Sequence, residues 1–292
     1  MTRFDELWKI AELNRRQVLA SGAATGFVTG FAMSTQPVSA QTMIVTDTAG
    51  LEAKMETFPA PDGKAVPVYR AYPKDGGPYP IIVVVQEIFG VHEHIKDVCR
   101  RLAKQGYYAI APSLFDRQGD VTQLKSFDEI RPIVSKVPDA QVMADIDAAI
   151  KWAAKTGPGD EGKVGITGFC WGGRIVWLYA AHNNAIKAGV AWYGRLVGDK
   201  NEITPSQPVD LAADLEVPVL GLYGGADTGI PVATVDQMKA ALGPDSKCEF
   251  QVYPDAPHAF FADYRPSYRE AAAKDAWGRM LAWFKDKGLT QS

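Results

Sequence analysis

Residues 168–173 read GFCWGG and place a cysteine between glycines. An apolar run typical of a strand, KVGIT (163–167), comes directly before them, and a pattern typical of a helix, RIVWLYAA (174–181), comes directly after. The residue at the tip of such a tight strand-to-helix connection has a strained backbone, and a glycine two positions away on either side lets the strand and the helix pass close together. The stretch therefore predicts a nucleophile elbow that presents the side chain of Cys170 in a cleft.

The helix that follows Cys170 would favour a negatively charged sulfur. The first turn of a helix has backbone N–H groups without intrahelical partners and carries the positive end of the helix dipole. Both features stabilise a thiolate, and both stabilise the oxyanion that forms when a nucleophile attacks a carbonyl carbon. The alternative is a buried cysteine in a glycine-rich turn, because free cysteine is among the most buried residue types.

The composition is that of a globular protein without a large excess of either charge. The chain has 292 residues, 47% of them hydrophobic, and it carries 31 Lys and Arg against 34 Asp and Glu. We expect one domain over residues 41–292 and no nucleic-acid partner, because the chain has no basic block to neutralise phosphates. The three cysteines, Cys99, Cys170 and Cys248, are too few for a disulfide framework and lack the paired spacing of zinc sites.

The first 40 residues differ in character from the rest of the chain. Arg15 and Arg16 precede a mildly apolar stretch at 18–34, and VSA at 38–40 fits a small-residue cleavage site. This pattern predicts a twin-arginine export signal over residues 1–40, its removal, and a periplasmic location. The alternative is a permanent membrane anchor, but a bilayer span needs about 20 strongly apolar residues, and this stretch is diluted by Gly and Thr. We therefore expect no stable membrane span after removal of the signal.

Short β-branched runs alternate with helical patterns along the rest of the chain. Strand patterns occur at 65–72, 81–85, 107–111, 163–167, 187–193, 217–223 and 247–253. Helical patterns occur at 94–106, 139–157, 173–182, 232–243 and 268–288. Nearly continuous apolar strands are buried on both faces, so the alternation predicts an α/β fold with a mostly parallel sheet and helices on both faces. The polar, proline-bearing segment 198–218 is expected to be a loop that forms the rim or cap of a site.

Two further residues complete a pattern for nucleophilic chemistry. A thiol nucleophile needs a base, and the base needs a carboxylate that orients it. Asp227 and His258 follow the predicted strands 217–223 and 247–253, at the carboxyl ends where parallel sheets bind ligands. The chain order Cys170, Asp227, His258 is that of nucleophile, acid and base in the α/β-hydrolase fold. Alternatively, Asp227 could cap the next helix and His258 could be an ordinary loop histidine.

The sequence resembles the dienelactone hydrolase family, a branch of the α/β-hydrolases with a cysteine in the elbow. The resemblance covers about residues 55–290. It rests on stretches in the family's order and spacing, which are VVVQEIFGVHEHI (83–95), APSLFDRQGD (111–120), GFCWGG (168–173), GGADTGIP (224–231) and DAPHAFF (255–261). It implies the α/β-hydrolase fold and hydrolysis of a carboxylic ester or lactone, similar to that of carboxymethylenebutenolidase.

The resemblance also implies roles for residues around the thiol. Glu87 would lie next to the thiol of Cys170 and take part in switching it between a resting thiol and a reactive thiolate. The backbone N–H groups of Ile88 and Trp171 would form the oxyanion hole. A glutamate just after a run of apolar strand residues is poorly explained by packing, because a buried, unpaired carboxylate is strongly destabilising. The alternative for Glu87 is a solvated strand end.

Two arginines are candidates for binding a substrate carboxylate. Arg117, in LFDRQGD, matches the family's arginine that holds this group, and the planar fork of a guanidinium suits the task. The alternative for Arg117 is a surface arginine. The family's second arginine lies four residues after the histidine, where this chain has Ala262. Arg265, three residues later, is expected to fill the same space or to serve a different substrate.

Together these residues predict that Cys170 attacks the carbonyl carbon of a small-molecule ester or lactone, while His258 transfers the proton and Asp227 orients the imidazole. This chemistry needs no metal or organic cofactor, and we expect no metal site, since His92 and His94 at a helix start would not face the same way. The main rival is a non-catalytic or redox protein on the same scaffold, with Cys170 as an oxidation-sensitive thiol. A peptidase or acyltransferase would differ only in the group that attacks the thioester.

Overall fold

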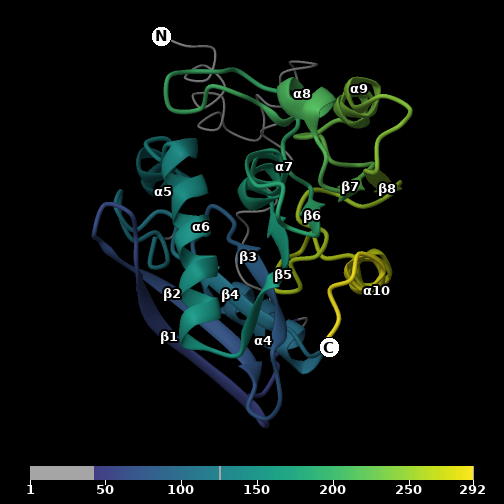
Figure 1. Ribbon diagram of the computed structural model, residues 1–292. Helices are drawn as coiled ribbons and strands as arrows, with labels where there is room; N and C mark the ends of the chain where they lie inside the picture. The colour runs from purple at the N-terminus through teal and green to yellow at the C-terminus, as the bar shows by residue number, and fades with distance from the viewer. Residues whose placement is uncertain (1–42, 125, 292) are drawn as a thin grey trace.

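The protein forms one open sheet of eight strands with helices on both faces (Figure 1). The computed structural model describes residues 43–124 and 126–291. Within these residues the strand order is β1-β2-β4-β3-β5-β6-β7-β8. The predicted export signal, residues 1–40, lies outside the described residues.

The elements alternate along the chain in the α/β manner. The strands are β1 (Leu51–Pro59), β2 (Ala65–Pro73), β3 (Tyr79–Val85), β4 (Tyr108–Pro112), β5 (Gly159–Phe169), β6 (Ala188–Trp192), β7 (Val219–Gly224) and β8 (Glu249–Tyr253). The helices are α4 (Glu93–Lys104), α5 (Phe127–Val134), α6 (Asp139–Thr156), α7 (Trp171–His182), α8 (Pro208–Leu211), the 3-10 turn η2 (Ala212–Asp214), α9 (Val232–Leu242) and α10 (Glu270–Asp286). None of the helices in the described part of the chain is long and apolar enough to cross a membrane.

The strands run mostly in one direction. Strand β1 pairs antiparallel with β2, and β2 pairs antiparallel with β4. The remaining neighbours, from β4 to β8, pair in parallel. Strand β2 therefore runs against the other seven, and the prediction of a mostly parallel sheet is confirmed. The loops that follow β3, β5, β6, β7 and β8 lie at one common edge, which is the edge where such sheets bind ligands.

Both faces of the sheet are buried. In β3, Ile81, Val83 and Val85 belong to one core cluster and Ile82 and Val84 to the other, as the two-residue period of a strand requires. Helices α6, α7 and α9 cover the first core, and α4 and α10 cover the second (Figure 1). The expected helices on both faces are present, and they explain why β3 is apolar at every position.

Strand β1 and helices α5 and α8 formed outside the predicted strands and helices. The edge strand β1 has no apolar run, because charged residues alternate along it. Two of them, Lys54 and Glu56, form an ion pair. Charges on an edge strand limit pairing with other chains. Helix α5 begins with a capping box of Ser126 and Glu129, which satisfies the first backbone N–H groups. Helix α8 interrupts the segment 198–218, for which only a loop was predicted.

Candidate active site

Cys170 lies at the tip of the connection between β5 and α7, where the backbone is strained. It is the N-cap of α7 and has φ 55° and ψ −112°, a conformation rarely adopted by residues other than glycine. Its backbone N–H donates a hydrogen bond of 3.0 Å to the carbonyl oxygen of Trp192, at the end of β6. The backbone strain predicted for the elbow is therefore present, and the Cys170 side chain is half-buried at the carboxyl edge of the sheet.

The glycines on either side of Cys170 leave no room for a side chain. A Cβ atom on Gly172 would lie 2.5 Å from the carbonyl oxygen of Val85 and 2.6 Å from that of Gln86. A Cβ atom on Gly168 would lie 2.4 Å from the carbonyl oxygen of Gly172. These contacts are with backbone atoms, so only glycine fits. The close approach holds the first turn of α7 against the end of β3, where the segment containing Ile88 begins.

Asp227 and His258 come from neighbouring strands and meet at this edge. The Nδ1 atom of His258 lies 2.7 Å from Oδ2 of Asp227. The other carboxylate oxygen of Asp227 accepts hydrogen bonds from the backbone N–H groups of Gly229, at 2.9 Å, and Ile230, at 3.0 Å. Both side chains are buried. The carboxylate is thus fully occupied in orienting the imidazole, as an orienting acid requires.

The imidazole of His258 is electrostatically coupled to the thiol of Cys170. Burial by itself lowers the pKa of His258, but the negative charges of Asp227 and of the Cys170 thiolate raise it well above its ordinary value. The Nε2 atom of His258 is buried and has no hydrogen bond of normal geometry to any described residue. Of the two ring nitrogens, Nδ1 contacts Asp227, and Nε2 is therefore the one without a hydrogen-bond partner among the described residues.

Backbone strain is concentrated around these residues. Among the described residues other than glycine, those with positive φ are Cys170 at 55°, Tyr193 at 37° and Ala259 at 58°. Tyr193 follows β6, and Ala259 follows His258. Strained backbone conformations are destabilising and cluster at functional sites. All three lie at the carboxyl edge of the sheet, which marks this edge as the candidate active site.

Glu87 is buried and ionised beside this edge. Its Oε2 atom accepts a hydrogen bond of 2.8 Å from the hydroxyl of Tyr264 and lies 3.4 Å from Nε2 of His92. Burial alone would raise the pKa of Glu87, but the hydrogen bond and charge of His92 and the charge of Arg265 lower it to about 2. The carboxylate thus makes its hydrogen bonds with Tyr264 and His92, and its expected part in activating Cys170 stays a prediction.

Arg265 lies in the same group of side chains as Glu87. Its guanidinium carbon is 4.3 Å from the ring centre of Phe89 and 4.6 Å from that of Tyr264. A guanidinium over an aromatic face is stabilised by the negative potential of the ring. Arg265 is buried, so its charge acts on Glu87 with little screening by solvent. The structure therefore brings Arg265 to the site, although it does not test the predicted contact with a substrate.

The guanidinium of Arg117 binds two aspartates. Two of its nitrogens bind the carboxylate of Asp62 at 2.6 and 2.9 Å, and two bind that of Asp145 at 2.6 and 2.9 Å. A guanidinium is planar, and here each of two sides of the plane's edge donates hydrogen bonds to one aspartate. The expected contact of Arg117 with a substrate carboxylate therefore stays a prediction.

His92 and His94 lie closer together than their spacing in the sequence suggested. Their rings are stacked with centroids 6.1 Å apart, because His92 is the N-cap of α4 and has an extended backbone. The expectation that they would not face the same way is therefore wrong. Each also lies near a carboxylate, His92 near Glu87 and His94 near Asp263. The described residues nevertheless contain no group of three or more His, Cys, Asp or Glu side chains that could hold a metal ion.

Sequence reasoning missed two residues that follow β6. Tyr193 was included in a predicted strand, but the strand ends one residue earlier. Arg195 is half-buried near the thiol: burial lowers the pKa of its guanidinium, and the charge of Cys170 raises it. A signal was available, because Tyr193 is the last residue of the predicted strand 187–193 and Arg195 follows it closely, at the carboxyl edge where Asp227 and His258 also lie.

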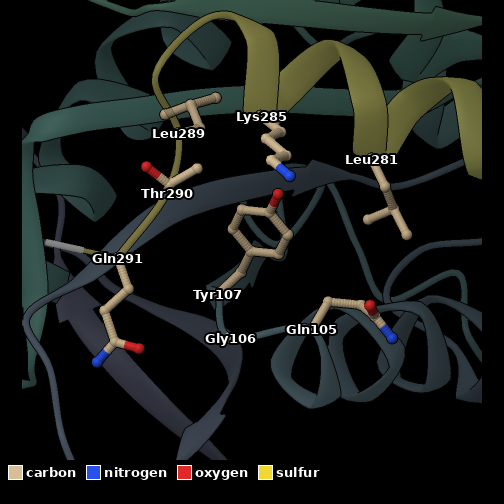
Figure 2. Close-up of a pocket in the computed structure, with 8 residues that line it drawn as sticks. All are labelled: Gln105, Gly106, Tyr107, Leu281, Lys285, Leu289, Thr290 and Gln291. Carbon is tan, nitrogen blue, oxygen red and sulfur yellow. The ribbon is translucent and has the colours of Figure 1, made fainter.

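Two cavities in the described part of the chain do not include Cys170 among their lining residues. A cavity of about 270 Å³ is formed by the segment before β4 and the end of α10 (Figure 2). Its lining residues are Gln105, Gly106, Tyr107, Leu281, Lys285, Leu289, Thr290 and Gln291. Strand β4 begins beside this cavity, so the cavity is at the amino edge of the parallel strands. A second cavity, of about 210 Å³, touches Gln86 and Gly90 near the end of β3. The chemical groups described above, and not the larger cavity, identify the site.

Comparison with known proteins agrees with this fold and identifies the family. The model of the dienelactone hydrolase family matches residues 66–288. A protein of Methylorubrum extorquens named "Putative carboxymethylenebutenolidase" is 60% identical over 99% of this chain and 100% of its own length. A protein of the same name from Escherichia coli K12 is 53% identical over 92% of this chain and 99% of its own length.

A solved structure gives the same result for the fold. The crystal structure of a "Putative Dienelactone Hydrolase" from Klebsiella pneumoniae has a TM-score of 0.78 and 56% sequence identity, and the match covers 80% of this chain and 98% of that one. The α/β-hydrolase fold expected from the sequence is therefore confirmed. The match over more than half of the chain, with these identities, shows that the chain belongs to the dienelactone hydrolase family.

Proposed function

We propose that the protein hydrolyses a carboxylic ester or lactone bond of a small molecule by acyl transfer through Cys170. The observation that carries the proposal is the meeting, at one edge of the sheet, of a cysteine in a strained elbow with a buried histidine that a buried aspartate orients. Such a set of nucleophile, base and orienting acid is recognised by geometry and not by position in the sequence.

In the first step the sulfur of Cys170 attacks the carbonyl carbon. The carbonyl oxygen becomes an oxyanion, which the backbone N–H groups of Ile88 and Trp171 stabilise. The carbon–oxygen bond to the leaving group then breaks, and the proton on His258 passes to the leaving oxygen. The product is a thioester on Cys170, together with a free alcohol or the opened end of the lactone.

In the second step water releases the acid. His258 accepts a proton from the attacking water, the thioester bond breaks, and the carboxylic acid leaves while the sulfur returns to its starting state. Asp227 keeps Nδ1 of His258 in place throughout and stabilises the imidazolium. The raised pKa of His258 supports this assignment, because it favours the protonated imidazole that an adjacent thiolate requires.

The charges around the thiol support an anionic substrate. The name of the relatives denotes hydrolysis of a butenolide with a carboxymethylene group, which is a lactone that bears a carboxylate. Arg195 interacts with the charge of Cys170, and Arg265 interacts with that of Glu87 beside the same edge of the sheet. We therefore propose a carboxylate-bearing lactone or ester as the substrate class, with Arg265 and Arg195 as its cationic partners.

The test compares wild type with Cys170→Ala on p-nitrophenyl acetate and on a small lactone. We expect the variant to fold normally and kcat/KM to fall roughly 10³-fold or more, because the nucleophile is lost. Mass spectrometry of the quenched wild-type reaction should detect an acyl group on Cys170. Cys248→Ala, a change at a half-buried cysteine that precedes β8, is the control and should keep full activity. Full activity in Cys170→Ala would contradict the proposal, and an inactive wild type would favour the non-catalytic or redox rival.

A further inference from the structure

The hydroxyl group of Tyr193 is a buried polar group at the site, and the mechanism above does not use it. The Tyr193 side chain has no exposed surface, and its hydroxyl oxygen has no hydrogen-bond partner among the described residues. The other fully buried tyrosines of the described chain each have such a partner. These pairs are Tyr79 with the carbonyl of Asp75, Tyr108 with Arg70, Tyr179 with Asp147, and Tyr223 with Trp177. Tyr193 is therefore an exception within this fold.

The surroundings of Tyr193 place its ring against the reacting groups. The ring lies edge-on to that of His258, with centroids 5.1 Å apart, and packs against Phe260 at 5.4 Å. Burial raises the pKa of the Tyr193 hydroxyl well above its ordinary value, and the charges of Glu87 and Cys170 add to this. The hydroxyl thus stays protonated as a donor, and it lies within electrostatic reach of both the thiol and Glu87.

Two features of Tyr193 are destabilising in the free protein. A buried donor without a partner loses the hydrogen bonds that water supplies in the unfolded chain. A positive φ is unfavourable for an aromatic residue, and Tyr193 has φ 37°. Phenylalanine would fill the same volume without the unpaired hydroxyl. A polar atom that the folded protein leaves unpaired beside a nucleophile is what a site for an oxygen-bearing ligand requires.

We propose that Tyr193 is a substrate-contacting residue whose hydroxyl donates a hydrogen bond to an oxygen atom of the bound ester or lactone. This inference rests on the function proposed above and adds a specific donor to it. The oxygen atoms of an acyl group gain negative charge as the sulfur attacks, so the bond strengthens in the transition state. Tyr193 would then contribute to kcat and not only to binding.

The experiment compares Tyr193→Phe with wild type. We expect kcat/KM for p-nitrophenyl acetate and for the neutral lactone dihydrocoumarin to fall about 10- to 100-fold, which is between the loss of an ordinary hydrogen bond and that of an oxyanion donor. We expect the midpoint of thermal unfolding to stay the same or rise, because the variant removes an unpaired buried hydroxyl. A residue with a purely structural role would not lose activity while keeping stability.

Tyr223→Phe is the matched control, since Tyr223 is also fully buried and its hydroxyl accepts a hydrogen bond of 3.1 Å from Nε1 of Trp177. This variant should unfold at a lower temperature and keep wild-type kcat/KM. Wild-type kcat/KM in Tyr193→Phe on both substrates would overturn the inference, as would a loss of activity that only follows a loss of stability. Turnover that persists in Cys170→Ala would instead overturn the proposed function, and the inference with it.

Discussion

Glu87 links the folding of the protein to pH. Its pKa is about 2 in the folded protein, against an ordinary value of 4.5. Above pH 4.5 the carboxyl is ionised in both states, and the stabilisation that it supplies is fully present. As the pH falls from 4.5 towards 2, the unfolded chain binds a proton at Glu87 and the folded protein does not, so this stabilisation is lost. The shift corresponds to a change in the free energy of unfolding of up to about 3 kcal/mol.

Glu87→Gln should remove this part of the pH dependence. We expect the free energy of unfolding, measured with urea at pH 7, 5 and 4, to fall less steeply with pH in the variant than in wild type. Burial lowers the pKa of His92, whose Nε2 atom lies 3.4 Å from the Glu87 carboxylate. Glu161→Gln, at an exposed position, is the control and should follow the wild-type curve. Parallel curves for wild type and Glu87→Gln would contradict the prediction.

Buried ion pairs tie the helices and loops around the sheet to one another. Arg174 in α7 binds both oxygens of Asp139, at the start of α6, at 2.7 and 2.8 Å. The same guanidinium donates to the side chain of Gln207 and to the carbonyl oxygen of Ser206, each at 2.8 Å. These contacts hold the segment 198–218 against the first turns of α6 and α7. The position of that segment is thus set by α6 and α7, beside the elbow.

Arg117 forms a comparable link, and its replacement should affect stability. Its side chain joins Asp62, in the turn between β1 and β2, to Asp145 in α6. Arg117→Ala would leave the buried carboxylate of Asp145 without its partner, which we expect to lower the free energy of unfolding by roughly 2 to 4 kcal/mol. The ratio of kcat/KM between a carboxylated and a neutral substrate should stay at the wild-type value.

The matched control for this link is Asp62→Asn. Asp62 is exposed, so its pair with Arg117 is screened by solvent and its loss should matter much less for stability. Urea unfolding measures the change in the free energy of unfolding, and steady-state kinetics on a carboxylated and a neutral substrate measures the ratio of kcat/KM. A fall in kcat/KM on the carboxylated substrate alone in Arg117→Ala would instead support the contact with a substrate carboxylate that the family resemblance implied.

The cellular location of the protein depends on the predicted export signal. The twin-arginine route carries folded proteins across the bacterial inner membrane, and it requires the arginine pair. Changing Arg15 and Arg16 together to Lys should leave the precursor in the cytoplasm of a Gram-negative host, as measured by fractionation and immunoblotting. Arg3→Lys, outside the pair, is the control and should be exported and shortened as wild type is. An unchanged periplasmic fraction in the double variant would contradict the prediction that Arg15 and Arg16 form a twin-arginine export signal.

Local patterns in the sequence determined most of the elements and the position of Cys170 in the elbow. Apolar runs and helical periodicity act through neighbours along the chain, so the central strands and the long helices could be predicted without the fold. The glycines on either side of Cys170 are needed for the backbone of the elbow itself, and Asp227 and His258 could be assigned because parallel strands share a carboxyl edge.

Only the tertiary structure decided the features that depend on distant segments. Strand β1 carries too many charges to be predicted alone, and it forms because β2 offers a pairing partner. Arg117 matches a substrate-binding pattern, yet Asp62 and Asp145 reach it from two other elements and occupy its donors. The unpaired hydroxyl of Tyr193 depends on every group that folds around it. Partners of polar side chains are set by three-dimensional proximity, and a single sequence does not contain that proximity in its local patterns.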